Sequence, residues 1–203
     1  MNNQHTAQTL SYYNQNAAQF SNSTQSLDFA SVQDKFLSFL QPQAHILDFG
    51  CGPGRDTKYF LDHGFRTDAI DGSEEFCRIA SEYTGVPVKQ MLFQELNASE
   101  EYDGIWACSS ILHSTYDELK DILKKLARAL KKEGILYASF KYGDFEGIRN
   151  GRYFIDMTED KLQKILQETD VFQIKEKWIS SDVRPGRDDE KWMNMILVKT
   201  SCI

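Results

Sequence analysis

The sequence predicts an α/β fold in which a mostly parallel sheet is finished by an antiparallel hairpin. Three observations support this fold class. Apolar runs alternate with amphipathic helical patterns over residues 46–140, an order that implies parallel strands joined by right-handed crossovers. A glycine-rich turn directly follows the first apolar run. Two strand-like runs, 172–178 and 192–199, end the chain and are separated by a Pro-Gly turn signal.

The composition predicts one domain spanning residues 1–203. The chain has 203 residues, of which 41% are hydrophobic, and a chain of this size buries roughly 70% of its unfolded surface. No linker or internal repeat divides it. The net charge of −7 argues against a nucleic-acid partner, because nucleic-acid-binding domains usually carry a basic surface.

The cysteines and the polar N-terminus indicate in which cellular compartment the protein lies and whether it binds a metal. The four cysteines are scattered without a C-x-x-C pair, so we expect no metal site and a reducing compartment. No apolar run approaches the roughly 18 residues of a membrane span, and no signal-peptide pattern opens the chain. We therefore expect a cytoplasmic protein without a membrane partner.

The first segment, residues 1–26, is rich in Asn, Gln, Ser and Thr. Tyr13, Ala17 and Phe20 nevertheless recur at helical spacing, which predicts a short amphipathic helix that frays before about Thr9. The first eight residues are equally well interpreted as a disordered tail. A second helix is expected over 31–40.

The remaining elements follow in chain order. The pattern predicts strands at 46–49, 67–70, 86–92, 102–109 and 135–140, helices at 55–63, 74–83 and 158–167, and a polar loop at 141–156. The clearest helix precedes the fifth strand. Its capping box is Thr115 with Glu118, Lys131 and Lys132 are expected in its last turn, and Gly134 is expected to end it.

The glycine-rich turn indicates a nucleoside ligand. Gly50, Gly52 and Gly54 alternate, and Arg55 stands where a dinucleotide fingerprint has its third glycine. The second strand ends at Asp71, about 20 residues further on, where an acid can bind a ribose diol. The alternative interpretation of the glycines is an ordinary tight turn, and that of Asp71 is a turn or helix-cap residue. Together, the two features predict a ligand that has a ribose and no required pyrophosphate.

These motifs resemble those of the class I S-adenosylmethionine-dependent methyltransferases. Residues 46–54 resemble the first motif of that family, Asp71 its second-strand acid, 102–106 its fourth-strand motif and 130–136 the turn into its fifth strand. The resemblance covers about residues 10–200 and extends to small bacterial members of unassigned substrate. It implies a three-layer, Rossmann-like fold with a seven-stranded sheet and an N-terminal helical lid region over residues 1–40.

The resemblance also implies a site for S-adenosylmethionine, with S-adenosylhomocysteine as the product. The cofactor-binding residues that it implies are Tyr13, Asp48, Gly50, Cys51, Gly52, Arg55, Asp71, Gly72, Ser73, Leu92, Phe93 and Cys108. The glycine loop would hold the methionine part, ordered by Asp48, and Asp71 would bind the ribose. Gly72 and Ser73 would flank the adenosine, and Tyr13 would close over the cofactor.

The other implied roles concern the two ends of the cofactor. Leu92 and Phe93 would border the adenine, although many family members have an Asp at the position of Leu92. Cys108 would offer its carbonyl to the ammonium group. Arg55 either meets the cofactor carboxylate or lies on the surface. In the turn before the fifth strand, Glu133 replaces the usual Pro.

The residues that would handle the acceptor are less clearly marked. His113 is the candidate general base because its ordinary pKa lies near neutrality, with a structural cap as the alternative. Arg152, Arg184 and Arg187 would either bind an anionic substrate or pair with nearby acids.

We therefore predict an enzyme that transfers a methyl group from S-adenosylmethionine to a small molecule by in-line displacement. The expected assembly is a monomer or a homodimer. The alternatives are an RNA or protein methyltransferase, a non-catalytic S-adenosylmethionine-binding regulatory module and an NAD-dependent oxidoreductase.

Overall fold

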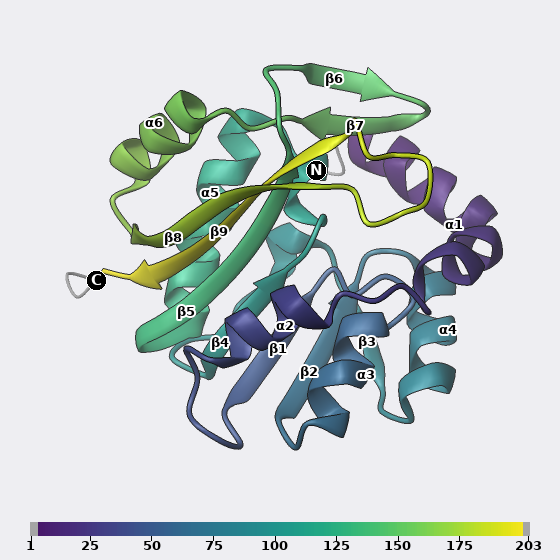
Figure 1. Ribbon diagram of the computed structural model, residues 1–203, viewed down its shortest axis with the longest axis horizontal. Coiled ribbons are helices and arrows are strands. Elements are labelled where there is room, and N and C mark those ends of the chain that lie inside the picture. Colours follow the sequence, from purple (N-terminus) through teal and green to yellow (C-terminus); the bar gives the residue numbers. More distant parts are fainter. Residues whose placement is uncertain (1–3, 201–203) are drawn as a thin grey trace.

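The computed structural model describes residues 4–200 and has a seven-stranded sheet in the order β3-β2-β1-β4-β5-β9-β8 (Figure 1). The strands are β1 (His45–Phe49), β2 (Arg66–Asp71), β3 (Val88–Gln90), β4 (Tyr102–Ala107), β5 (Leu130–Lys141), β8 (Phe172–Ser181) and β9 (Lys191–Lys199). β1 to β5 pair in parallel, and β9 is antiparallel to both β5 and β8. The predicted fold class is confirmed.

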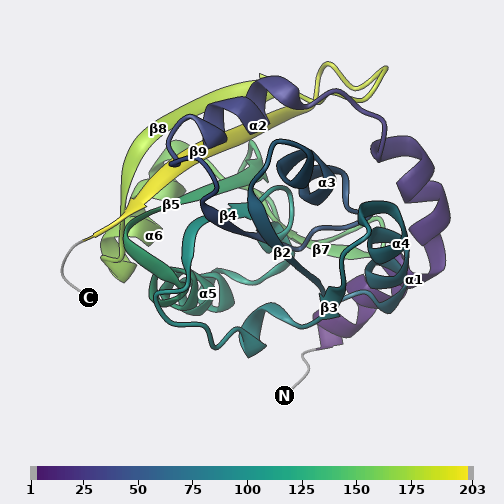
Figure 2. The ribbon, with the colours of Figure 1, turned by 90° about the horizontal axis from the view of Figure 1, so that it is seen from below.

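Helices cover both faces of this sheet (Figure 2). One face carries α2 (Ala30–Leu37), α3 (Arg55–Asp62) and, towards β3, α4 (Glu74–Thr84), and the other carries α5 (Tyr116–Ala129) and α6 (Glu159–Thr169). Successive strand side chains point to opposite faces. Ile105 therefore packs in the apolar core that includes α5, and Trp106 packs in the core on the other face, which includes Phe36 of α2. Both are buried, which explains why β4 is a nearly continuous apolar run.

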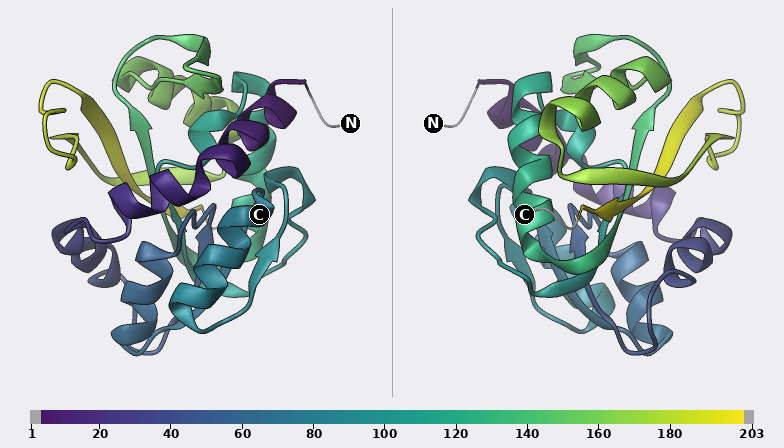
Figure 3. Two further views of the ribbon diagram at one scale, coloured as in Figure 1. Left: turned by 90° about the vertical axis from the view of Figure 1, so that its right-hand side faces the viewer. Right: turned by 90° about the vertical axis from the view of Figure 1, so that its left-hand side faces the viewer.

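Two further elements lie across the carboxyl ends of the parallel strands (Figure 3). They are α1 (Gln4–Thr24) and an antiparallel hairpin of β6 (Glu146–Arg149) and β7 (Arg152–Ile155). The backbone N–H of Tyr153 donates to the hydroxyl of Thr9 at 3.0 Å, which ties β7 to α1. Helix α1 begins before the predicted Thr9, and residues 1–3 of the expected N-terminal tail lie outside the described residues.

The expectation of a loop over 141–156 is wrong, because this segment contains the β6–β7 hairpin. Its turn is Asn150-Gly151, with φ values of 50° and 79°. A two-residue Asn-Gly turn with positive φ at both positions matches the twist of the flanking strands. The sequence signal was therefore present in the dipeptide.

The predicted end of the longest sheet-covering helix is also wrong. Helix α5 ends at Ala129, and the next residue is extended (φ −73°, ψ 141°). Leu130 is fully buried and pairs with Tyr102 at the start of β5. Lys131 therefore lies on β5, where its Nζ contacts Asp103 at 2.9 Å, and Gly134 lies within that strand.

Smaller differences concern element lengths. Helix α2 stops at Leu37, β3 is reduced to three residues, and β8 and β9 extend beyond the predicted limits. Within residues 4–200, no helix combines the length and the apolar character that a membrane crossing requires.

Candidate functional site

The glycine loop forms a tight turn between β1 and α3. Gly50, Gly52 and Gly54 have φ values of 84°, 54° and 90°, which favour glycine. A Cβ at Gly50 would lie 2.5 Å from Cβ of Ser110, whereas a Cβ at Gly52 would meet no atom within 4 Å. The loop is therefore packed against the protein at Gly50 and open at Gly52.

Asp71 connects the end of β2 to this loop. Its carboxylate accepts hydrogen bonds from the backbone N–H groups of Gly52 at 2.9 Å and Ser73 at 2.8 Å. Burial raises the pKa of Asp71 to about 6. Ser73 itself is fully buried, caps α4 and donates its hydroxyl proton to Asn14. Its side chain thus links α4 to α1 behind the site.

Asp48 lies near the end of β1 and is bound to α3. It is 2% exposed and accepts a hydrogen bond from the hydroxyl of Thr57 at 2.5 Å. Burial, followed by the charge of Asp56, raises the pKa of Asp48 well above its usual range. Asp48 does not reach the cavity described below.

Asp56 is a buried carboxylate that the sequence analysis missed. It accepts hydrogen bonds from Gln33 at 2.6 Å, from the indole N–H of Trp106 at 2.9 Å and from Nε of Arg55 at 2.8 Å. The guanidinium of Arg55 also lies 4.5 Å from the ring centre of Phe29. Arg55 is therefore held by an ion pair at the edge of the cavity.

These parts meet in a cavity of about 250 Å³ at the carboxyl ends of the parallel strands. Its walls come from the glycine loop, α1, β7 and the segment 180–187. The predicted site residues that line it are Tyr13, Gly50, Cys51, Gly52, Arg55, Asp71, Gly72, Leu92, Phe93, Cys108 and His113. Asp48 and Ser73 are the two predicted residues that lie behind this wall.

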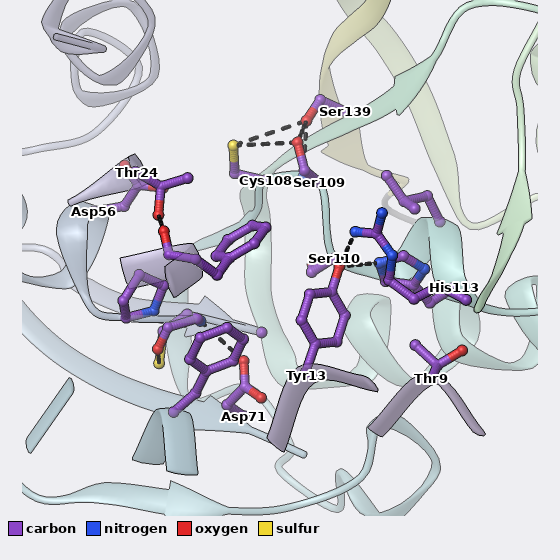
Figure 4. Close-up of a pocket in the computed structure, with 18 of the residues that line it drawn as sticks. Thr9, Tyr13, Thr24, Asp56, Asp71, Cys108, Ser109, Ser110, His113 and Ser139 are labelled. Carbon is purple, nitrogen blue, oxygen red and sulfur yellow. Dashed lines mark hydrogen bonds between the residues drawn. The ribbon is translucent and has the colours of Figure 1, made fainter. Parts of the chain in front are cut away.

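Tyr13 and His113 form the polar centre of the cavity (Figure 4). The hydroxyl oxygen of Tyr13 lies 2.8 Å from Nε2 of His113, and Nδ1 of His113 lies 2.6 Å from the carbonyl oxygen of Tyr153. Because a carbonyl oxygen can only accept, Nδ1 carries the proton and Nε2 accepts from Tyr13. NH1 of Arg152 donates to the same hydroxyl at 3.2 Å.

Burial determines the protonation of these groups. It lowers the pKa of His113 to about 4, with a further contribution from the charge of Arg152, and it raises the pKa of Tyr13. Near neutral pH the pair is thus a neutral imidazole that accepts from a neutral phenol. Burial also raises the pKa of Cys108 to about 12, so its thiol stays protonated.

The far wall of the cavity includes polar residues that the sequence analysis did not single out. The backbone N–H of Ser109 donates to the hydroxyl of Ser139 at 2.9 Å, and Asn194 on β9 accepts from the hydroxyl of Tyr137 at 2.8 Å. Ser109 lies two residues after the end of β4 and has a φ of 53°. The available signal was that Ser109 and Ser139 lie near the carboxyl ends of β4 and β5.

Comparison with known proteins extends this description. Residues 46–134, from β1 into the start of β5, match the family model described as a methyltransferase domain. A 98-residue stretch is 36% identical to an N-terminal Xaa-Pro-Lys N-methyltransferase 1 of Danio rerio, covering 44% of each chain. A 99-residue stretch is 29% identical to a malonyl-[acyl-carrier protein] O-methyltransferase of Enterobacter lignolyticus, covering 46% of this chain and 37% of that protein. The chain thus matches less than half the length of these curated relatives.

Solved structures share the fold over most of the chain. A 1,6-didemethyltoxoflavin-N1-methyltransferase of Burkholderia thailandensis, solved with 1,6-didemethyltoxoflavin and S-adenosylhomocysteine, has a TM-score of 0.77 at 21% identity, covering 96% of this chain and 88% of that chain. The N-methyltransferase NodS of Bradyrhizobium japonicum, in complex with S-adenosylhomocysteine, has a TM-score of 0.72 at 13% identity, covering 96% and 100%. Residues 46–134 thus match a methyltransferase domain, and the chain as a whole shares the fold of solved methyltransferases that bind S-adenosylhomocysteine.

Proposed function

We propose that this protein transfers a methyl group from S-adenosylmethionine to a small-molecule acceptor by in-line displacement. One observation carries the proposal. Gly52, which has open space beside it, and Asp71, which accepts its backbone N–H, line the same cavity. This wall lies at the carboxyl ends of β1 and β2, where open α/β sheets bind their ligands.

The residues present fit the cofactor. Empty space adjoins Gly52, so a ligand can lie against the loop backbone there. The carboxylate of Asp71 accepts backbone N–H groups of Gly52 and Ser73, and a carboxylate has about four lone-pair sites, so it can also accept from a ribose hydroxyl. Leu92 and Phe93 offer apolar surface for adenine. The thiol of Cys108 stays protonated and uncharged, so we propose its backbone carbonyl as the acceptor for the ammonium group of the cofactor. When bound, the cofactor supplies an activated methyl group on a sulfonium sulfur.

We propose that Tyr13 and His113 orient the attacking atom of the acceptor. The lone pair on Nε2 of His113 already accepts the proton of Tyr13, so an incoming O–H or N–H can join this hydrogen-bonded chain. An imidazole with a pKa of about 4 is a weak base at neutral pH. It therefore suits alignment of the acceptor better than removal of its proton before methyl transfer, because in-line attack requires a distance of about 3–3.5 Å.

A small acceptor suits the cover over the cavity. Helix α1, β7 and the segment 180–187 contribute side chains around the Tyr13–His113 pair, and α1 is tied to β7 through Thr9 and Tyr153. A protein or RNA acceptor would have to reach past these segments.

Two measurements test the proposal. Isothermal calorimetry should detect binding of S-adenosylmethionine and S-adenosylhomocysteine and no comparable binding of NAD, and failure to bind S-adenosylmethionine would sink the proposal. Formation of S-adenosylhomocysteine should then be followed with pooled small metabolites, RNA and peptides as acceptors. Turnover with RNA or peptides alone would contradict a small-molecule acceptor. Tight cofactor binding without turnover of any acceptor would favour a regulatory module.

A further inference from the structure

The cations that line the cavity differ in their partners. Four of them are ion-paired, in the pairs Arg55–Asp56, Lys141–Glu190, Arg184–Asp182 and Arg187–Glu190. Arg152 also lines the cavity, and no carboxylate of residues 4–200 lies within ion-pair distance of it. The expected pairing with nearby acids therefore holds for Arg184 and Arg187 and fails for Arg152.

Aromatic rings hold the Arg152 guanidinium in place. Its central carbon lies 4.5 Å from the ring centre of Tyr12, 5.1 Å from that of Phe154 and 5.5 Å from that of Tyr13. These rings provide cation–π attraction and fix the side chain without neutralising its charge. The guanidinium is thus preorganised on β7 and faces the cavity with its charge uncompensated.

The hydrogen-bonding capacity of Arg152 is also largely unused. A guanidinium has five N–H donors, and one of them contacts the hydroxyl of Tyr13. Its Nε is buried and has no hydrogen-bond partner in the described part of the chain. A buried donor without an acceptor is unfavourable, and a planar oxyanion bound to the fork would remove this cost.

We propose that Arg152 binds a carboxylate of the methyl acceptor, so that the acceptor is a small carboxylic acid with an apolar, aromatic body. This inference rests on the function proposed above. The planar fork of Arg matches a carboxylate in a bidentate pair. The rings of Tyr13 and Phe154 lie beside the guanidinium, and Trp192 also lines the cavity. Because Arg152 and His113 share the hydroxyl of Tyr13, the bound carboxylate places the rest of the acceptor beside the Tyr13–His113 pair.

The competing occupant is the carboxylate of the cofactor itself. A binding experiment that holds the cofactor site saturated separates the two. Benzoate and benzamide should be titrated by calorimetry or ligand-observed NMR into protein saturated with S-adenosylhomocysteine. We expect benzoate to bind at least tenfold more tightly than benzamide. Arg152→Gln should abolish this preference, Arg152→Lys should restore part of it, and the affinity for S-adenosylhomocysteine should stay within twofold in both variants.

A matched control is Arg149→Gln, which removes an arginine from the same hairpin. Arg149 pairs with Asp156 at 2.7 Å and does not line the cavity, so the benzoate preference should persist. Equal binding of benzoate and benzamide to the native protein would overturn the proposal, as would an unchanged preference in Arg152→Gln. A tenfold loss of S-adenosylhomocysteine affinity in Arg152→Gln with the preference retained would assign Arg152 to the cofactor instead.

Turnover provides a second readout. Hydroxybenzoates and aminobenzoates should give more S-adenosylhomocysteine than the corresponding amides, and Arg152→Gln should raise KM for the acids with a smaller change in kcat. Preferred turnover of the amides would contradict the inference. If the native protein fails to bind S-adenosylhomocysteine at all, the proposed function fails instead, and the two failures are distinguishable.

Discussion

At the scale of single residues, the proposed role of Asp71 in cofactor binding can be tested by one substitution. It accepts hydrogen bonds from Gly52 in the glycine loop and from Ser73 at the start of α4, and we propose that it also binds the ribose. Hydrogen bonds to a charged group contribute roughly 1.5–3 kcal/mol each, and about 1.4 kcal/mol is a tenfold change in affinity. Asp71→Ala should therefore weaken S-adenosylhomocysteine binding by tenfold or more in calorimetry, whereas Asp62→Ala, on the exposed end of α3, should not. Unchanged affinity in Asp71→Ala would show that the ribose does not bind to this residue.

The pKa of Asp71 gives this residue a second, pH-dependent signature. Burial raises its pKa from 3.8 to about 6, so the carboxylate that would accept ribose hydroxyls is present above pH 6. S-adenosylhomocysteine affinity should fall as the pH drops through about 6, and Asp71→Asn should flatten that dependence. The same shift favours the protonated form in the folded chain, so this group adds stability as the pH falls from above 6 towards 3.8. An affinity that is constant between pH 7 and 5 would contradict the assignment.

The hydroxyl of Tyr13 is the third feature that a single substitution can test. It lies between NH1 of Arg152 and Nε2 of His113, and Tyr13→Phe removes both contacts while keeping the ring. If this chain of hydrogen bonds aligns the acceptor, kcat should fall by roughly 10- to 100-fold, near the lower range for groups that handle a proton. The affinity for S-adenosylhomocysteine should change little. Tyr59→Phe, whose hydroxyl contacts Asp34 away from the cavity, is the control, and an unaltered kcat in Tyr13→Phe would exclude the role.

At the scale of elements, two glycines in the turn between β1 and α3 are expected to have different roles, Gly50 in packing and Gly52 in cofactor binding. Gly50→Ala would bring a Cβ to 2.5 Å from Ser110 at a φ of 84°, and overpacking of this kind typically costs about 1–3 kcal/mol. Gly52→Ala meets no protein atom within 4 Å but fills space proposed for the cofactor. Urea denaturation should show the larger loss of stability in Gly50→Ala. Calorimetry should show weaker S-adenosylhomocysteine binding in Gly52→Ala.

The control for these two glycines is Gly64→Ala, which has a φ of 81° and no atom within 4 Å of its added Cβ but lies outside the cavity. It measures the cost of a side chain at positive φ alone. Gly52→Ala and Gly64→Ala should lose similar stability, and only Gly52→Ala should lose affinity. Equal affinities in the two variants would place the cofactor away from the open face of the loop.

The elements also show what a sequence can predict. The order of β1 to β5 followed from apolar runs and cap signals, because these patterns are local. The β6–β7 hairpin was missed although Asn150-Gly151 indicates it, since each strand has only four residues and none of the four in β6 is buried. The end of α5 escaped because Leu130 continues the apolar repeat of the helix while packing in β5. A buried position is apolar in either structure, so periodicity cannot assign it.

Contacts between residues far apart in the sequence limit how much of the site could be predicted. Most of the predicted cavity residues lie at strand ends, and topology brings strand ends together. The carboxylate of Asp56, by contrast, is satisfied by side chains 23 and 50 residues away in the sequence. Arg184 pairs with Asp182 and Arg187 with Glu190, whereas Arg152 has no carboxylate partner among residues 4–200. This difference is likewise an outcome of packing, because all three arginines lie near acids in the sequence.

At the scale of the whole molecule, the cavity joins distant parts of the chain. Residues from α1, from the glycine loop and from β9 line it together, so a ligand that binds there stabilises the folded state as a unit. At a concentration 100 times its Kd, a ligand adds about 2.7 kcal/mol, and for a chain of this size each kcal/mol raises Tm by about 2–4 °C. S-adenosylhomocysteine should therefore raise Tm by roughly 5–10 °C in a thermal-shift experiment. NAD should not, because Arg55 replaces the third glycine of a dinucleotide loop and is held by Asp56. A larger rise with NAD than with S-adenosylhomocysteine would favour an oxidoreductase, and no rise with either would contradict a nucleoside site at this loop.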